Sequence, residues 1–485
     1  MELKKYKLSE VATFEISNVD KKTKAGELSV HLCNFTDVYY NWAVTEAMGD
    51  SFMVATASDN QIKKLSLRKG QVAITKDSET RHDIGIPTYI ANDFDNTVLG
   101  YHCALITPNP EMLDGRYLNA YLNSSLAKEY FANNASGSGM RYSLPVDAIK
   151  NILLYLPSIE VQREIGKIFS DIDRKIALNR EINRNLEAMA RQLYDYWFVQ
   201  FDFPDENGRP YKSSGGKMVW NEKLKRDIPK GWKECTLHRY IGRITNGLNP
   251  RQNFVLGTGS NFYVSIRSLE GRDINWESCE KCDDSALAKI NSRSQLQCGD
   301  VIFSAIGTIG RTYYIQEDPN NWNISETSFA IRPSKEIPSS FFYELLISPE
   351  IQMQADKNAM GSTMRCLVMD ALCKIPTMDI PTNVVNKFNN IIAPIHNALY
   401  ERNKEKRNLY KLREELLPLL MNGQVSVMPP EVNCDLYLLQ LSILLTFDHI
   451  VLHNIRTPQQ EGESCRGRWM VLPLSRGGCR LHRRS

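Results

Sequence analysis

The stretch SIEVQREIGKIFSDIDRKIALNREINRNLEAMARQLYDYWFVQF, residues 158–201, decides the fold of this chain. Apolar residues recur at alternating steps of three and four from Val161 to Tyr196, and only Lys175 and Asn179 interrupt them. This spacing predicts a long helix that packs along another long helix, with Ser158 as its N-cap. At ~1.5 Å per residue, about 40 residues form a rod of ~60 Å.

The chain then repeats itself. The pentapeptide GSGMR at 137–141 matches GSTMR at 361–365, and the Leu-Pro pair at 156–157 matches Ile-Pro at 380–381. A second helical pattern, Phe388 to Leu419, lies 223 residues after the pattern of the first rod. Several matches in the same order indicate a tandem duplication: globular unit, rod, polar connector, globular unit, rod.

Each rod has a single apolar seam, so the two rods are expected to pack on each other. Two copies joined in this way give antiparallel helices related by a pseudo-two-fold axis. The predicted fold class is α+β, with two globular domains separated by two long antiparallel helices. Four polar seam residues near the middle of the rods leave two alternatives open: they face solvent, or they form a polar layer that fixes register. These residues are Lys175, Asn179, Arg402 and Glu405.

Two further features bear on the elements. The segment 114–130 has the spacing of one amphipathic helix. Pro418, near the end of the second rod, is expected to end or kink that helix early.

Composition sets outer limits. A net charge of +3 over 485 residues neither requires nor excludes nucleic acid, because local patches decide binding. The eleven cysteines follow no disulfide pattern, and the N-terminus has no apolar signal core, so we expect a cytoplasmic protein with reduced thiols. The apolar run at 436–447 is too short to cross a membrane, and no membrane partner is expected.

Motifs of catalysis are near-misses. Asn109-Pro110-Glu111 lacks the second proline and the aromatic residue of an adenine methyltransferase loop. Pro204-Asp205 has no Glu-x-Lys after it, as a common nuclease motif requires, and the glycines at 215–216 have the wrong spacing for a phosphate loop. Cys279 and Cys282 lack two further zinc ligands and are interpreted as free surface thiols. His102-Cys103 is a poor dyad, because neighbouring strand residues point to opposite faces. We therefore predict no catalytic, cofactor or metal site.

Polar loops with glycine and arginine are instead suited to DNA. Glycine lets a backbone approach phosphates closely, while Arg and Gln have the bidentate geometry that base edges require. Such loops are equally the composition of ordinary surface turns. Arg141 and Arg365 are the stronger candidates, since both copies keep an arginine there. The candidate DNA-binding residues are Lys76, Arg81, Arg141, Tyr142, Arg251, Gln252, Arg311 and Arg365.

Four segments together carry a family resemblance: FDFPDENGRPYKSSGGKMVWNEKLKRDIPKGW (201–232), LPSIEVQREIGKIFSDIDRKI (156–176), GDVIFSAIGTIGR (299–311) and GQVAITKDSETRHDIG (70–85). On these segments, residues 1–423 resemble the specificity (S) subunit of a type I restriction–modification system. The family pattern ends near Gln424, so residues 424–485 are expected to form an atypical tail. Two alternatives stay open: a poorly ordered extension, or a helix that packs on the assembly with a basic tip touching DNA.

The resemblance implies a recognition subunit without an active site or cofactor, whose two domains each read half of a bipartite site in double-stranded DNA. It implies docking of two modification subunits, which bind S-adenosylmethionine and methylate adenine, and of restriction subunits that translocate and cleave DNA. The alternative is a coiled-coil scaffold that binds two protein partners. The expected domains are a first target recognition domain (1–157), a long helix (158–203), a connector (204–232), a second target recognition domain (233–381), a second long helix (382–423) and the tail (424–485).

Overall fold

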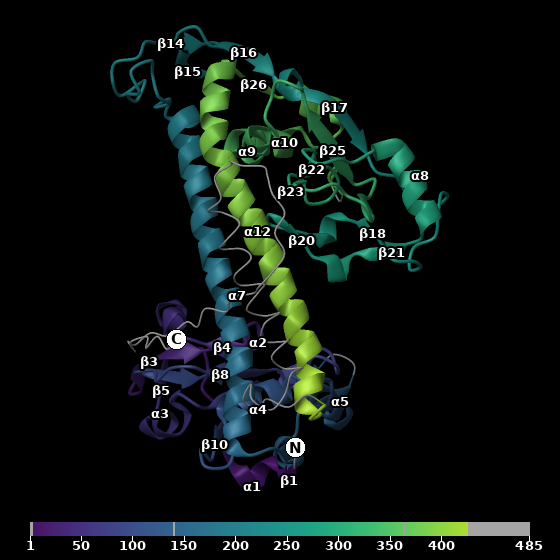
Figure 1. Ribbon diagram of the computed structural model, residues 1–485. Coiled ribbons are helices and arrows are strands. Elements are labelled where there is room, and N and C mark those ends of the chain that lie inside the picture. The colour runs from purple at the N-terminus through teal and green to yellow at the C-terminus, as the bar shows by residue number, and fades with distance from the viewer. Residues whose placement is uncertain (1–2, 139–140, 363, 425–485) are drawn as a thin grey trace, which may run out of the picture. The chain divides into compact units, whose positions relative to one another are not determined.

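The computed structural model describes residues 3–138, 141–362 and 364–424, so the tail lies outside the described residues except for Gln424. Two long helices, α7 (Ile159–Tyr194) and α12 (Thr382–Met421), each follow a globular unit in the chain (Figure 1). Ser158 is the N-cap of α7, as predicted, but its side chain makes no capping hydrogen bond. At its other end α7 passes into a π-helical turn, η2 (Asp195–Val199).

The first unit is built on a five-stranded sheet with the order β2-β10-β6-β8-β4. Its central strands β6 and β10 read as continuous apolar runs rather than alternating ones, because both faces are buried. A three-stranded sheet (β5-β3-β9), a small sheet (β11-β12-β7) and the pair β1-β13 complete the unit. The strands are β1 (Lys4–Lys7), β2 (Ala12–Ile16), β3 (Leu28–Cys33), β4 (Ala43–Val44), β5 (Met53–Ala57), β6 (Val72–Thr75), β7 (Asp77–Ser78), β8 (Pro87–Ile90), β9 (Thr97–Leu99), β10 (Cys103–Pro108), β11 (Ser136–Ser138), β12 (Arg141–Ser143) and β13 (Leu153–Leu156). The helices are α1 (Leu8–Val11), α2 (Phe35–Tyr39), η1 (Glu46–Ser51), α3 (Asp59–Leu65), α4 (Gly115–Leu122), α5 (Ser125–Asn134) and α6 (Val146–Asn151).

The second unit uses sheets with the orders β17-β25-β22-β23 and β21-β18-β24, and the pairs β16-β26 and β19-β20. Its strands are β16 (Lys233–Thr236), β17 (Ile241–Asn246), β18 (Asn261–Val264), β19 (Leu269–Glu270), β20 (Asp273–Ile274), β21 (Glu280–Cys282), β22 (Val301–Ser304), β23 (Thr312–Tyr314), β24 (Trp322–Ile324), β25 (Ser328–Pro333) and β26 (Pro376–Asp379). Its helices are η3 (Leu237–Tyr240), η4 (Ile266–Ser268), η5 (Trp276–Ser278), α8 (Asp284–Ser294), α9 (Ser339–Ile347), α10 (Pro349–Asn358) and α11 (Met369–Cys373).

The strand pairing confirms the duplication. In the first unit β3 pairs antiparallel with β5 and parallel with β9, and in the second β18 pairs antiparallel with β21 and parallel with β24. The order β2-β10-β6 corresponds to β17-β25-β22, and the closing pair β1-β13 corresponds to β16-β26. The two units therefore share one topology.

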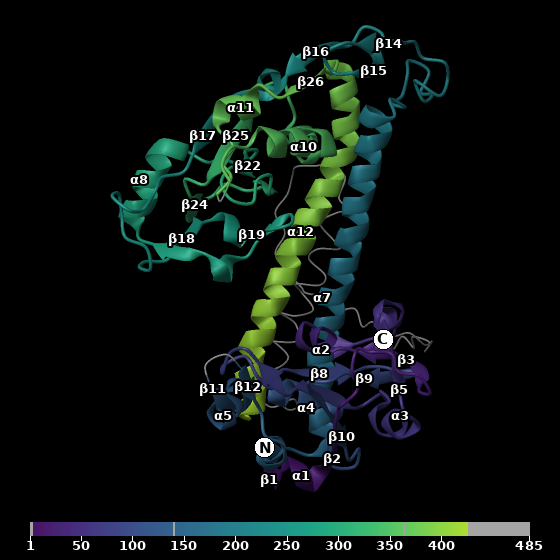
Figure 2. The same cartoon turned by 180° about the vertical axis from the view of Figure 1, so that it is seen from behind.

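Helices α7 and α12 pack antiparallel, as Figure 2 also shows. Asn179 Nδ2 donates to Glu405 Oε2 at 2.8 Å, and further along α7 Asn183 Nδ2 donates to Asn403 Oδ1 at 2.8 Å. Lys175 Nζ lies 3.3 Å from Glu405 Oε1. Asn179 is fully buried, so the polar residues form a layer between the helices and do not simply face solvent.

The apolar seam is correct in its middle but rotates near its ends. Met189 on α7, Tyr196 in the π-helical turn η2 and Ile391 on α12 belong to the predicted seam, yet they are exposed. Their neighbours Ala190, Trp197 and Ile392 are buried in their place. An α-helix of 3.6 residues per turn drifts by about 20° per heptad from a strict 3.5-residue repeat, which moves the buried face to the neighbouring residue.

Two other predictions need correction. The segment 114–130 forms two helices, α4 and α5, because the Ser124 side chain caps a new helix by accepting from Ala127 N. Helix α12 continues for three residues after Pro418 and also contains Pro394, so the expected early end is wrong. A helix can retain an internal proline where tertiary packing outweighs the lost hydrogen bond.

The connector between the units is folded. It contains the hairpin of β14 (Met218–Asn221) and β15 (Arg226–Pro229). The Phe203 ring stacks on Tyr211 at 4.9 Å and on Trp232 at 5.1 Å between ring centroids. These aromatic contacts fix the connector at the end of α7, although its composition indicated only a polar linker. In the described part of the chain, no helix is long and apolar enough to cross a membrane.

Candidate nucleic-acid interface

In the first unit, four loops meet at one end of the five-stranded sheet. The backbone N–H of Lys76, just after β6, donates to the carbonyl of His102, just before β10, at 2.7 Å. Leu144 N, just after β12, donates to the carbonyl of Lys76 at 2.7 Å. The segment after β2 joins the group, since Tyr101 N donates to Val19 O at 2.9 Å. This sheet end therefore holds loops that are far apart in sequence.

All four predicted residues of the first unit lie either in the loop after β6 or on the neighbouring strand β12. Lys76 Nζ lies 3.3 Å from Ser143 Oγ, on β12. The guanidinium of Arg81 lies 5.7 Å from the centre of the Tyr142 ring. Arg141, on the same strand, is exposed and points its Nη2 to within 2.9 Å of His102 Nδ1. The structure thus brings the four residues into one region.

The second unit has the same arrangement of loops. Ala305 N donates to Thr327 O and Leu367 N donates to Ala305 O, both at 2.8 Å, which reproduces the bonds around Lys76. Gly307 N donates to Arg365 O at 2.8 Å. The short sheet of the first unit is reduced here to single bridges from Cys366 to Ile306 and Met360.

The predicted residues of the second unit fall into two groups. Arg251 and Gln252 are exposed in the turn that follows β17. Arg311 Nη1 instead donates to the carbonyls of Ile266 and Leu269, each at 3.1 Å.

Arg365 is held in a similar way, because its guanidinium pairs with the carboxylate and backbone carbonyl of Asp356 on α10. Arg311 and Arg365 therefore support the fold, whatever else they contact, whereas Arg141 and Arg251 face outward.

Sequence reasoning missed two residues of the first site. Asp77 Oδ2 lies 2.5 Å from His102 Nδ1, and Asp77 also faces Lys76 and Arg141, each at 3.7 Å. Burial tends to raise the pKa of Asp77, but hydrogen bonds from His102 and Ser143 and the Lys76 charge lower it overall. The signal for Asp77 was its place next to a predicted site residue. No pattern in the sequence connected His102 with Asp77, because Asp77 lies on β7 and His102 lies in the turn before β10.

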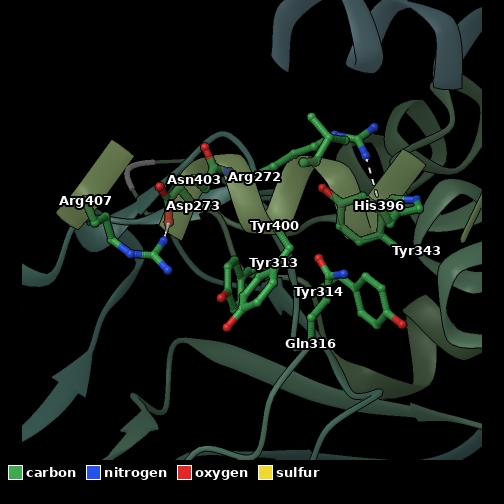
Figure 3. Close-up of a pocket in the computed structure, with 11 residues that line it drawn as sticks. Arg272, Asp273, Tyr313, Tyr314, Gln316, Tyr343, His396, Tyr400, Asn403 and Arg407 are labelled. Carbon is green, nitrogen blue, oxygen red and sulfur yellow. Dashed lines mark hydrogen bonds and ion pairs between the residues drawn. The ribbon is translucent and has the colours of Figure 1, made fainter. Parts of the chain in front are cut away.

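A buried charged cluster anchors the second unit on α12 (Figure 3). Glu344 Oε1 on α9 lies 2.9 Å from His396 Nε2 on α12, and it accepts a hydrogen bond from Arg272 Nη1 at 3.0 Å. Asp273, next to Arg272 in the β19–β20 hairpin, accepts from Arg407 Nη1 on α12 at 2.5 Å. These contacts hold the unit at one place along the helix.

The pKa values in this cluster have clear causes. Burial lowers the pKa of His396, and the nearby Glu344 carboxylate offsets only part of this effect. Burial alone would raise the pKa of Glu344, but His396 and Arg272 lower it overall. We therefore infer a neutral imidazole beside an ionised carboxylate at neutral pH.

Cys279 and Cys282 are free thiols but are buried, so the expectation of surface thiols is wrong. Cys279 packs in the apolar core around Trp322, and Cys282 packs against Ala286 and Leu287. Both cysteines therefore serve as small apolar side chains in the core.

Two mixed α/β units of one topology, joined through an antiparallel pair of long helices, define an architecture seen before. The crystal structure of the S subunit of a type I restriction–modification system from M. genitalium matches 87% of this chain and 96% of its own, with a TM-score of 0.52 and 15% identity. The shared fold is therefore that of a specificity subunit.

Sequence comparisons agree. Residues 2–188 match the family model described as the type I restriction modification DNA specificity domain. The HindI specificity subunit of Haemophilus influenzae is 24% identical over 411 residues, covering 75% of this chain and 88% of that protein. The MjaIX specificity subunit of Methanocaldococcus jannaschii is 22% identical over 374 residues, covering 76% and 82%.

The family model thus covers residues 2–188, and the relatives that match about three quarters of the chain are specificity subunits of type I restriction enzymes. Each of these relatives is one subunit of a larger restriction enzyme.

Proposed function

We propose that each globular unit reads one half of a bipartite DNA site and that α7 and α12 set the distance between the halves. The observation that carries this proposal is the shared topology of two units on one antiparallel helix pair. Two similar readers at a fixed separation suit two half-sites with an unread gap. In this proposal the target recognition domains span 1–157 and 233–381.

The reading surface in each unit is the sheet end where the four loops meet. Exposed Arg81, Arg141, Arg251 and Gln252 are the direct DNA contacts, with Lys76 and Tyr142 beside them. Arg311 and Arg365 position their loops through the backbone and Asp356. Arg and Gln can each make paired hydrogen bonds to base edges in the major groove.

We further propose that the helix pair docks two modification subunits, in the cytoplasm. An open groove on its surface is lined by Met189, Leu193, Tyr196, Ile391 and Ile395. Met189 and Tyr196 are exposed large side chains on a surface otherwise rich in charge. Exposed apolar patches of this kind mark protein interfaces.

A charge placed in this groove should weaken assembly. Met189→Asp with Ile391→Asp should reduce co-purification of the modification subunit by about tenfold or more, because a charge would be buried. Exposed Leu28→Asp, in the first unit, is the matched control. Unchanged assembly in the double variant would contradict this docking site.

Methylation profiling tests the whole proposal. A host carrying the complete system should show methylated adenines within one bipartite sequence of fixed gap. Binding of the assembled complex to that duplex should weaken steeply with salt, since phosphate contacts release counterions. A continuous, ungapped target would contradict the assignment of two separate readers.

A further inference from the structure

A distinctive feature of the first unit is the group that two residues not predicted from sequence, Asp77 and His102, form with Arg141. His102 Nδ1 lies 2.5 Å from Asp77 Oδ2 and 2.9 Å from Arg141 Nη2, while Arg141 Nη2 lies 3.7 Å from the same carboxylate oxygen. With Lys76 Nζ at 3.7 Å from Asp77 Oδ1, three side chains with nitrogen donors converge on one carboxylate at the sheet end. The group lies within the reading surface proposed above.

The hydrogen-bond donors and acceptors of this group show which side chain can still bind DNA. A 2.5 Å approach to an ionised carboxylate requires a proton on His102 Nδ1, so this nitrogen donates to Asp77. Arginine has only donors, and therefore its 2.9 Å contact with the same nitrogen is not a hydrogen bond. Arg141 is consequently oriented by the Asp77 charge and by a long hydrogen bond of 3.4 Å that its Nη2 donates to His102 Nε2, the acceptor in this tautomer, while most of its donors stay free. Its side chain is 64% exposed.

The backbone at His102 is unusual as well. Its φ is +73°, in the left-handed region that residues other than glycine seldom adopt. The carbonyl bond to Lys76 N holds this conformation, and the half-exposed Tyr101 ring lies 4.0 Å from the imidazole ring. Strained backbone persists where surrounding contacts fix it, often at functional sites.

The second unit shows that the fold itself does not need this group. There the equivalent backbone hydrogen bond joins Ala305 to Thr327, so Ala305 corresponds to Lys76 and Thr327 to His102. The residue after Ala305 is Ile306, which corresponds to Asp77. Hence the positions of Lys76, Asp77 and His102 carry no charge in the second unit. The cluster is a property of the first reader alone.

We propose that Asp77 and His102 hold Arg141 as a base-reading guanidinium that selects guanine in the first half-site. Guanine presents two acceptors, O6 and N7, to which an arginine can donate in parallel. A cation intended only for phosphate would gain from its full charge, and a neighbouring carboxylate would oppose the phosphate. The Asp77 carboxylate offsets part of the positive charge of the Arg141 guanidinium but fixes its direction. This arrangement suits hydrogen bonding to a neutral base edge. This inference rests on the proposed function.

The test uses the full chain in its complete modification complex. We would measure methylation of a library varied across the first half-site, and binding at several salt concentrations. Arg141→Lys should keep binding to DNA but lose the preference for guanine at one position by roughly five- to a hundredfold. Lys63→Ala, an exposed residue of α3 outside the four loops, should leave the profile unchanged.

The positioning role has its own outcome. Asp77→Asn and His102→Gln should weaken preference at that same position without weakening binding to unrelated DNA, and Asp77→Glu should restore part of it. The contrary result is an equal loss of affinity for all sequences in Arg141→Lys, with a slope of log binding constant against log salt concentration that is smaller by about one. That result would identify Arg141 as a phosphate contact and overturn the inference. An unchanged base preference would overturn it too. Absence of any bipartite methylation by the wild-type complex would instead refute the proposed function.

Discussion

At the scale of single residues, equivalent positions in the two units make different contacts. Arg141 and Arg365 lie 224 positions apart in matching loops, but Arg141 is presented outward and Arg365 is paired with Asp356. A residue type kept in both copies therefore did not mean the same contact in both. Side-chain partners distant in sequence, which the repeat pattern does not show, made the difference.

Arg311 provides a direct test of the structural role. Its guanidinium donates to the carbonyls of Ile266 and Leu269, so Arg311→Ala should lower the stability of the second unit by about 1–2 kcal/mol. Thermal or denaturant unfolding would measure this loss, with exposed Arg251→Ala as the control that leaves stability unchanged. Equal stability of the two variants would show that these hydrogen bonds contribute nothing.

His396 should make the stability of the second unit depend on pH. Its folded-state pKa lies below the ordinary value of 6.5, so the unfolded chain binds the extra proton more readily. Stability is therefore present above pH ~6.5 and is lost as the pH falls below that value. Glu344, whose pKa is also lowered, adds a loss only at more acidic pH, below its ordinary 4.5.

The measurement is the unfolding midpoint between pH 7.5 and 5.5. His396→Gln should reduce the fall in midpoint over this range, because no imidazole then needs to stay neutral beside Arg272 and Glu344. Exposed His238→Gln should keep the wild-type dependence. An equal fall in wild type and His396→Gln would show that other groups govern the acid loss.

At the scale of elements, the sequence predicted the long helices well because a 4-3 repeat of apolar residues over five heptads is typical of a long packed helix and does not fit a strand or a loop. It did not predict which residue at the ends of the seam would be buried. Ala190 and Trp197 replace Met189 and Tyr196, because α7 and η2 pack there against the aromatic core of the second unit around Phe341. That contact depends on tertiary structure.

The polar layer in the middle was visible in sequence as an interruption, and the structure shows its use. Asn179 and Asn183 bond to Glu405 and Asn403 across the helix pair. Because buried polar groups need partners, sliding one helix would leave these amides unsatisfied. The layer therefore favours one register, which a helix pair that sets spacing requires.

Lengthening both helices should lengthen the gap in the DNA site. A heptad inserted after Arg174 in α7 and another after Lys411 in α12 would keep the Asp173–Arg413 pair on one side and the Asn179–Glu405 bond on the other. Seven residues add ~10.5 Å of helix, or about three base pairs at ~3.4 Å each.

Methylation profiling should thus find the same half-sites with a longer gap. A heptad in α7 alone is the control, and it should destabilise the protein because register is lost. An unaltered gap in a stable double-insertion variant would refute the spacing role.

At the scale of the whole molecule, the duplication was the most informative prediction, because it supplied the partner of each helix and the antiparallel direction. The duplication did not predict which residues attach each unit to helix α12. The second unit contacts α12 through Glu344, which binds both Arg272 and His396. The first unit contacts α12 through the Trp42 ring, which lies 4.5 Å from the Arg413 guanidinium. Such attachments use residues outside the repeated motifs, so one sequence without their spatial neighbours does not reveal them.

These attachments predict where the chain can be shortened. Helix α12 ends at Met421, and residues 1–422 form one compact unit. A chain that stops after Gln424 should therefore keep the unfolding midpoint and the methylation profile of the full protein. A chain that stops after Lys411 should lose stability, because it removes Arg413 with its contacts to Asp173 and Trp42, and also buried Leu416 and Leu420. If removal of residues 425–485 abolished assembly or methylation, the tail would be a working part of the subunit.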